Sequence, residues 1–242
     1  MRGEQTVGDM LAWRRELSVV QDVGAFVPQQ RVVAAALGAT RLVWAAEISA
    51  SAFRIAPDRP LYGRVLTEAD ERAGAPPVAV VGYELWRDRL GADPDIVGRS
   101  VRIGSGYATV VGVMPEGFGF PVAHELWMPF RTDAADAAPR SGPSITVFGK
   151  LAPGATLEMA QAELTSIGRR LAAESPTTHA QLQPRVSPYG QPGTPGSDDF
   201  SMIVAIYTFI IVLLVVVCST VALLLFARAA SRETEILVRS AL

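Results

Sequence analysis

The carboxylates Glu68, Asp70 and Glu71 form the densest group of side chains in this sequence that could do chemistry. Two carboxyl groups held close together can act as general acid and general base in a hydrolytic reaction. These three stand in a polar stretch just before Gly74, and a solvated loop explains them more readily than a catalytic pair does. We therefore expect a surface loop here rather than an active site.

The two histidines and the single cysteine do not combine into a metal site. His124 and His179 lie far apart, without the short spacings typical of zinc ligands, and Cys218 lies inside an apolar run. No cysteine pair is present to complete a tetrahedral zinc site. We expect each histidine to be a surface or turn residue, and we expect the chain to bind no metal.

The sequence motifs of common enzymes are also missing. The chain has no GxxxxGKS or GxxxxGKT phosphate loop, no GxSxG, no HExxH and no GxGxxG after a strand. The formal net charge is -2, so no basic surface for nucleic acid is indicated. We predict no catalytic residue, no cofactor and no nucleic-acid partner. We expect core or interface anchors at the four tryptophans, which are Trp13, Trp44, Trp86 and Trp127.

A run of 26 positions without a charged side chain, Met202–Ala227, lies near the C-terminus. It exceeds the ~18 apolar residues that indicate a spanning helix, and a helix pairs its backbone groups internally, as lipid requires. A buried helix of a soluble domain seldom stays apolar on every face over this length. The run therefore predicts a single transmembrane helix.

The charges that flank the apolar run predict its orientation. Asp198 and Asp199 precede it, whereas Arg228 and Arg232 follow it. Arginine and lysine accumulate on the cytoplasmic side of membrane helices. We therefore expect a protein of the cell (inner) membrane with residues 1–199 extracytoplasmic and the C-terminus cytoplasmic.

The first 30 residues lack the charged and apolar regions of a signal peptide. Nothing in them would carry the following domain across a membrane. We therefore expect this chain to be a fragment of a parent protein that has an earlier transmembrane helix.

Strand and helix patterns alternate before the apolar run and predict an α+β domain with a mixed sheet. The expected domains are this extracytoplasmic domain at 1–199, a transmembrane helix at 200–230 and the start of a cytoplasmic coupling segment at 231–242. The expected helices are 9–17 with Asp9 as its cap, 83–90, and 156–174 with Thr156 as its N-cap. The expected strands are 31–37, 41–48 after a turn at Gly38, 78–81, 100–103, 107–113, 126–129, 145–151 after a loop at 134–143, and 181–186.

Three stretches together resemble the FtsX-like ABC transporter permeases with a MacB-type periplasmic core domain. The first, 78–118, runs from VAVVGYELWRDRLGADP to VVGVMPEGF. The second is KLAPGATL at 150–157 with the helix that follows it. The third, 218–242, is similar to the second transmembrane helix of the family and the cytoplasmic segment after it.

The resemblance implies a permease subunit fragment of an export or mechanotransmission system. Such a subunit couples a separate cytoplasmic ATP-binding subunit to an extracytoplasmic domain, and it works beside a second permease copy or as a homodimer in the lipid bilayer. In this scheme Arg232, Glu235 and Arg239 would contact the ATP-binding subunit. From the residues alone, Glu235 and Arg239 also fit an intrahelical ion pair of about 0.3–0.5 kcal/mol. The alternative function is a single-pass anchored extracytoplasmic binding or scaffold protein without an ATPase.

Overall fold

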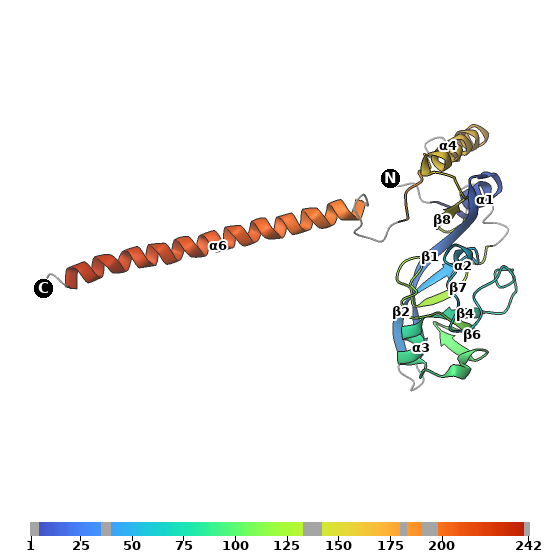
Figure 1. The fold of residues 1–242 in the computed structure, drawn as a ribbon, viewed down its shortest axis with the longest axis horizontal. Coiled ribbons are helices and arrows are strands. Elements are labelled where there is room, and N and C mark those ends of the chain that lie inside the picture. The colour runs from blue at the N-terminus through green and yellow to red at the C-terminus, as the bar shows by residue number, and fades with distance from the viewer. Residues whose placement is uncertain (1–4, 35–39, 133–141, 180–182, 190–197, 240–242) are drawn as a thin grey trace. The chain divides into compact units, whose positions relative to one another are not determined.

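The computed structural model describes residues 5–34, 40–132, 142–179, 183–189 and 198–239, and in the last of these ranges it describes the side chains of 201–228. The chain divides into two compact units, Met1–Pro188 and Tyr189–Leu242. The first unit contains the sheet and most of the helices, and the second contains one long helix (Figure 1).

Six described strands of the first unit close into a small barrel. They are β1 (Val20–Ala34), β2 (Thr40–Ile48), β4 (Val78–Val81), β5 (Ser100–Ile103), β6 (Gly106–Val113) and β7 (Leu126–Pro129). The order β1-β2-β7-β4-β6-β5 returns to β1, where Val33 pairs with Ile103. The β2–β7 and β4–β6 pairs are parallel and the others are antiparallel, which confirms the predicted mixed sheet of an α+β domain.

The barrel is filled by the inward-facing residues of its strands. Along β5 exposed and buried positions alternate, and the buried Val101 and Ile103 join the same core as Val110 of β6. Helix α3 (Tyr83–Arg89) adds the fully buried Leu85 to this core. The predicted strands at β4, β5 and β6 and the predicted helix after β4 are therefore confirmed.

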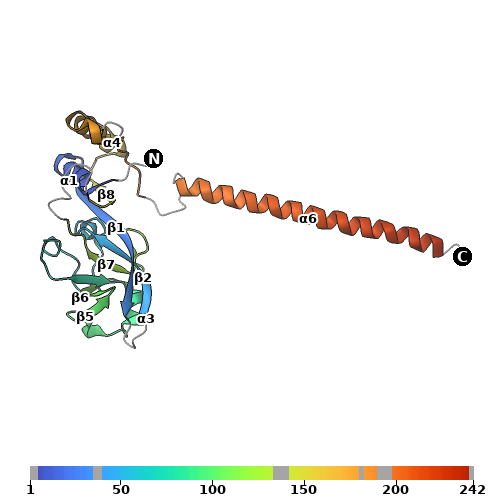
Figure 2. The ribbon, with the colours of Figure 1, turned by 180° about the vertical axis from the view of Figure 1, so that it is seen from behind.

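Strand β1 is longer than the sequence pattern predicts. It begins at Val20, eleven residues before the predicted start at Arg31, and its first part pairs with β8 (Thr146–Leu151) rather than with β2. The early part was missed because Asp22, Gly24 and Pro28 interrupt the apolar alternation on which strand prediction depends. From behind, Figure 2 shows β1 running from the barrel to the end of the unit that carries α1 and α4.

We call the two ends of this unit the barrel lobe and the helical lobe. The barrel lobe consists of Phe26–Ala34 of β1 with β2 to β7, including the short β3 (Tyr62–Gly63), which pairs with β6. The helical lobe consists of Val20–Ala25 of β1 with α1 (Val7–Glu16), β8, α4 (Leu157–Glu174) and α5 (Pro176–His179).

The helix starts in the helical lobe depend on their caps. Thr156 caps α4 as predicted, because its hydroxyl accepts the backbone N–H of Met159 at 3.3 Å. The predicted cap of α1 is wrong, since the N-cap is Thr6 and Asp9 lies in the first turn. There the Asp9 carboxylate accepts the backbone N–H of Thr6 at 3.1 Å. Trp13 of α1 packs on Leu164 and Ile167 of α4.

Several connecting segments also differ from the sequence-based expectation. A short helix, α2 (Ala52–Ile55), stands where only loop and turn were expected. The predicted strand 181–186 is wrong for residues 183–186, which have no regular secondary structure, and its first two residues lie outside the described ones. The predicted turn at Gly38 and most of the predicted loop 134–143 also lie outside the described residues.

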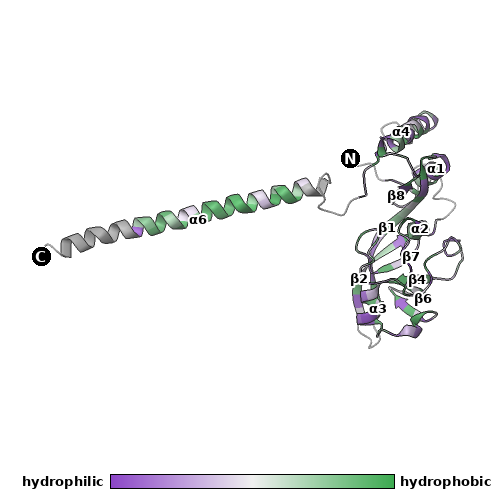
Figure 3. Ribbon diagram, viewed as in Figure 1, coloured by the Kyte–Doolittle hydropathy of each residue, from purple (hydrophilic) through white to green (hydrophobic). Residues whose placement is uncertain are grey.

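The second unit is dominated by α6 (Asp198–Arg239), a helix of 42 residues. Its section Ser201–Arg228 is long and apolar enough to cross a membrane, and in the hydropathy view of Figure 3 it is mostly green, with pale bands between the green segments. Within the unit none of this section is buried against other parts of the chain. Among the residues that the structure describes, one apolar helix that could cross a membrane is therefore found, at the position predicted from the sequence.

Candidate functional site

The joint between the two lobes lies where β1 changes its partners. Phe26 pairs with Ile48 of β2 on one side and with Thr146 of β8 on the other. Toward Val20 no strand among the described residues pairs with the β2 side of β1, because the chain turns away into α2. The backbone groups of β1 there need other hydrogen-bond partners, since unpaired buried groups are costly.

Two buried serines take over the role of the missing strand. The backbone N–H of Ser49 donates to the carbonyl of Ala25 at 2.9 Å, and Ser49 Oγ accepts the N–H of Ala25 at 3.0 Å. Ser51 Oγ lies 2.9 Å from Ser49 Oγ and donates to the carbonyl of Val23 at 3.3 Å. Both serines are 2 % exposed. The sheet edge is thus closed by side chains rather than by a strand.

Helix α1 reaches the same point through an arginine. Arg14 donates from Nε and Nη2 to the carbonyl of Val23 at 3.1 and 2.8 Å, so this one oxygen joins α1, β1 and the turn after β2. Gly24 lies beside it, and a Cβ there would be 2.5 Å from Ser51 Oγ and 2.6 Å from the Phe148 ring. A side chain at residue 24 would therefore force the side chains of Ser51 and Phe148 to shift.

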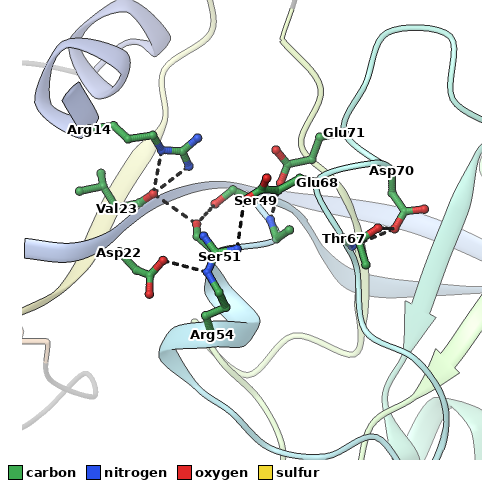
Figure 4. Close-up of polar contacts among 11 residues, drawn as sticks. Arg14, Asp22, Val23, Ser49, Ser51, Arg54, Thr67, Glu68, Asp70 and Glu71 are labelled. Atoms are coloured by element: carbon green, nitrogen blue, oxygen red, sulfur yellow. Dashed lines mark hydrogen bonds and ion pairs between the residues drawn. The ribbon is translucent and has the colours of Figure 1, made fainter.

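An outer set of charged residues surrounds this joint, as Figure 4 shows. Arg54 of α2 pairs with Asp22 of β1 at 2.9 Å and with Glu68 at 3.2 Å. The backbone N–H of Ala50 donates to the Glu71 carboxylate, and burial raises the pKa of Glu71. Because Arg54 and Glu68 are exposed, we assign the outer ion pairs at most about 1 kcal/mol each. We call this set of side chains the polar joint. Its members are Arg14, Asp22, Ser49, Ser51, Arg54, Glu68 and Glu71.

The three carboxylates therefore do not share one environment. Glu68 is exposed at the surface, as predicted for a solvated loop. The same prediction is wrong for Asp70 and Glu71, because Asp70 is buried and Glu71 accepts a backbone hydrogen bond. Each carboxylate binds different donors, so the group functions as a set of anchors rather than as an acid–base pair.

Asp70 anchors the loop that follows β3. It accepts two hydrogen bonds from Arg64, at 2.6 and 2.9 Å, and two from the backbone and hydroxyl of Thr67, both at 2.8 Å. These contacts, led by Arg64, lower the pKa of Asp70 from 3.8 to about 2. Since the folded-state pKa lies below that of the unfolded chain, the ionised carboxylate stabilises the fold at neutral pH.

We expect Asp70→Asn to lose about 1–2 kcal/mol of unfolding free energy at pH 7, because Arg64 and Thr67 lose a charged acceptor. The difference from the wild type should shrink as the pH falls from 3.8 toward about 2, where wild-type Asp70 also becomes neutral. Urea unfolding of the full chain in mild detergent at pH 7, 4 and 2.5 measures this. Asp58→Asn, at an exposed position in the loop before β3, is the control. A gap that stays constant across this pH range would contradict the assignment.

Both histidines are buried, so the prediction of surface or turn histidines is wrong. His124 is 5 % exposed and packs edge-on against Phe26 with ring centroids 5.9 Å apart. Its Nδ1 has no hydrogen-bond partner among the described residues, and burial lowers the pKa of His124. His179 pairs with Asp9, with Nε2 and Oδ1 3.1 Å apart. The apolar partner of His124 lies 98 residues away and the carboxylate partner of His179 lies 170 residues away, so neither could be identified from local sequence.

Among the residues that the structure describes, no three His, Cys, Asp or Glu side chains gather in a way that could hold a metal ion. The polar joint is built of hydroxyls, arginines and carboxylates whose atoms mostly bind one another and the backbone. Such an arrangement fixes the relation between the two lobes. The sequence analysis missed Arg14, Ser49 and Ser51, because their role depends on a strand edge that pattern reading does not reveal.

The predicted contact residues Arg232, Glu235 and Arg239 lie on α6, in the second unit. The structure describes their backbone as helical. Spacings of three, four and seven residues place these positions on one face of a helix. Their side chains lie outside the described ones, so their role as contacts stays a prediction.

The chain was compared with protein families and with known proteins. The family of MacB-like periplasmic core domains matches residues 2–167. No curated protein matches the sequence.

Solved structures share the fold at low identity. The periplasmic region of MacB from Actinobacillus actinomycetemcomitans is 16% identical with a TM-score of 0.55, over 74% of this chain and 78% of that chain. The extracellular domain of the noncanonic ABC-type transporter YknZ from Gram-positive bacteria is 15% identical with a TM-score of 0.55, over 74% and 89%. A domain of a putative permease protein from Porphyromonas gingivalis is 13% identical with a TM-score of 0.53, over 73% and 76%.

The resemblance noted in the sequence is therefore confirmed by both the family match and the fold. This chain belongs to the family of MacB-like periplasmic core domains, and it continues into a helix that could cross a membrane.

Proposed function

We propose that this chain is a permease subunit of an ABC-type export or mechanotransmission system, in which a separate cytoplasmic subunit hydrolyses ATP. The observation that carries the proposal is the continuity of α6 after a MacB-like core domain. The helix runs on without a break for eleven residues past Arg228, where the apolar section ends. At 1.5 Å per residue its 42 residues span about 63 Å, roughly twice the hydrocarbon core of a bilayer. A helix of this kind can carry a displacement from one side of a membrane to the other.

The proposed location is the cell (inner) membrane, with residues 1–199 outside and the C-terminus in the cytoplasm. Two aspartates precede the apolar section of α6, and arginines at its end and beyond follow the usual bias of cytoplasmic flanks. In this orientation Arg232, Glu235 and Arg239 lie on the cytoplasmic side, where an ATP-binding subunit would contact them. A second copy of the permease would complete the assembly in the bilayer.

The alternative is a single-pass anchored binding or scaffold protein without an ATPase. An exposed apolar strip on the barrel lobe favours it, since Val32, Leu42 and Trp44 lie on the outer face of the β1–β2 hairpin. Of the four tryptophans predicted as core or interface anchors, Trp44 is the exposed one, whereas the other three are buried. The two functions differ in one expected property: a permease binds an ATP-binding subunit, whereas a scaffold protein of this kind does not.

The partner test uses the full tagged chain, co-expressed with a candidate ATP-binding subunit and purified in mild detergent. The double exchange Glu235→Arg with Arg239→Glu keeps an intrahelical ion pair but reverses both charges toward a partner. If these residues contact the ATP-binding subunit, its recovery should fall at least about tenfold, which corresponds to ~1.4 kcal/mol. Glu233→Gln is the matched control on another face of the helix. Recovery of no ATP-binding subunit by the wild-type chain would favour the scaffold function.

The orientation test uses single cysteines in a Cys218→Ser background. Tyr107→Cys places a thiol on the β5–β6 hairpin, where the wild-type side chain is 64 % exposed, and Ser240→Cys places one after α6. In spheroplasts a membrane-impermeant maleimide should label the first thiol directly and the second only after permeabilisation. The reverse pattern would overturn the proposed orientation.

A further inference from the structure

The segment that leaves the first unit is fastened to α4 by one glutamine. Residues 183–188, here called the exit strap, follow α5 and end the unit from which the chain continues toward α6. Gln161 Nε2 donates to the carbonyl of Pro184 at 3.1 Å, and Gln161 Oε1 accepts the N–H of Val186 at 2.7 Å. One side-chain amide thus forms the pair of hydrogen bonds that a neighbouring strand would form.

Packing holds the same segment from the apolar side. Val186 packs against the cluster of Trp13, Leu164 and Ile167 that joins α1 to α4. Gly168 of α4 leaves room for Pro184, because a Cβ at residue 168 would be 3.1 Å from two of the proline ring atoms. The exit strap therefore contacts α4 through both polar and apolar groups.

A buried pair secures the chain just before the exit strap. His179 Nε2 lies 3.1 Å from Asp9 Oδ1, and both side chains are buried. His179 Nδ1 lies 2.8 Å from the hydroxyl of Thr178. These contacts join α5 to α1, while Glu16 and Arg170 form an ion pair between α1 and α4 at the surface. The anchoring body is thus a pair of helices rather than α4 alone.

We propose that the exit strap is a coupling element that transmits displacement of α6 to the α1–α4 helix pair, with Gln161 as its main positioning residue. This inference rests on the proposed permease function. Anchoring at Val186 leaves eleven residues before α6, which can extend to at most roughly 38 Å. A chain anchored only at His179 would leave 18 residues and could extend to roughly 63 Å. We call the two hydrogen bonds from Gln161 to the exit strap the clamp. The clamp shortens the free segment before α6, which would otherwise extend and absorb the displacement of α6.

Hydrogen exchange of the full chain in lipid nanodiscs tests the clamp. Gln161→Leu removes both hydrogen bonds to the strap, whereas Gln161→Glu keeps an acceptor for the N–H of Val186. We expect the Val186 amide to exchange at least about tenfold faster in Gln161→Leu and within about threefold of the wild type in Gln161→Glu, since exchange follows local opening. The amide of Leu164 in α4 should be unchanged in both variants. A Val186 amide that exchanges in the wild type as in an unstructured peptide would overturn the proposal.

Pulling single molecules of the full chain tests the transmission itself. Handles at Tyr107→Cys and Leu242→Cys, in a Cys218→Ser background and in lipid bicelles, apply tension across the exit strap. Wild type should show only gradual stretching of the segment after Val186 before the domain unfolds, whereas Gln161→Leu should show an additional early step of roughly 25 Å when the anchor at Val186 is lost. Identical traces for the two proteins would overturn the proposal. Both measurements use the chain without an ATP-binding subunit, so their result is independent of the co-purification that tests the permease function.

Discussion

Replacing Trp127 with alanine is expected to lower the free energy of unfolding by about 3–5 kcal/mol. Trp127 is fully buried in β7, beside Val80 of β4 and Ala46 of β2. Its indole ring packs edge-on against Phe118 with centroids 5.2 Å apart. The substitution leaves a large cavity, and such cavities relax only partly in close-packed interiors.

The same substitution also removes a hydrogen bond. Trp127 Nε1 donates to the carbonyl of Phe120 at 2.7 Å, and without it that carbonyl loses this donor. Trp44→Ala is the matched control, because Trp44 lies on the neighbouring strand and is 55 % exposed. It should change the unfolding free energy by less than about 1 kcal/mol. Urea unfolding in mild detergent, followed by the fluorescence of the remaining tryptophans, compares the two. Similar losses in both variants would contradict the assigned core.

Gly112→Ala is expected to cost about 2–3 kcal/mol, because β6 and the segment after β3 touch along their backbones. A Cβ at residue 112 would lie 2.1 Å from the carbonyl oxygen of Arg64, which no side-chain rotation can relieve. Gly63 faces Gly112 across the pair and is equally crowded, with a Cβ position 2.2 Å from the carbonyl of Val111. The two segments must therefore separate if either glycine gains a side chain.

Gly106→Ala on the same strand is the matched control. A Cβ at residue 106 meets no atom within 4 Å, so we expect the unfolding free energy to change by less than about 0.5 kcal/mol.

A double variant distinguishes separation of the two segments from a general loss of stability. Since Arg64 would be displaced from Asp70, Asp70→Asn should cost less in the Gly112→Ala background than in the wild type. Equal costs in the two backgrounds, measured by urea unfolding, would contradict the proposed displacement.

Elements with a strong local pattern were predicted closely from the sequence. The strand β5, the helix α3 after β4 and the cap of α4 at Thr156 all depend on residues that are close to one another in sequence. Their information is local, because apolar periodicity and capping act between near neighbours. The early half of β1 is the counter-example, since its polar residues obtain partners from β8 and from α2.

Asp70 and His179 show why the burial of polar groups is difficult to predict from sequence. Asp70 was expected in solvent and is buried because Arg64 and Thr67 supply its donors. His179 is buried because Asp9, 170 residues earlier, provides a polar partner for its ring, with Nε2 and Oδ1 3.1 Å apart. The burial of a polar side chain depends on its partner, and a partner distant in sequence is known only once the chain has folded.

The apolar section of α6 and the charges around it could be recognised without coordinates, because insertion in a bilayer depends on composition over one continuous segment. Family membership was likewise indicated by contiguous motifs, of which 78–118 is the longest. Only the tertiary structure shows three other features, which are the closure of the barrel at Val33, the polar joint at Val23 and the clamp at Gln161. Each of these joins segments far apart in sequence, and their meeting is decided by the packing of the whole domain rather than by any local preference.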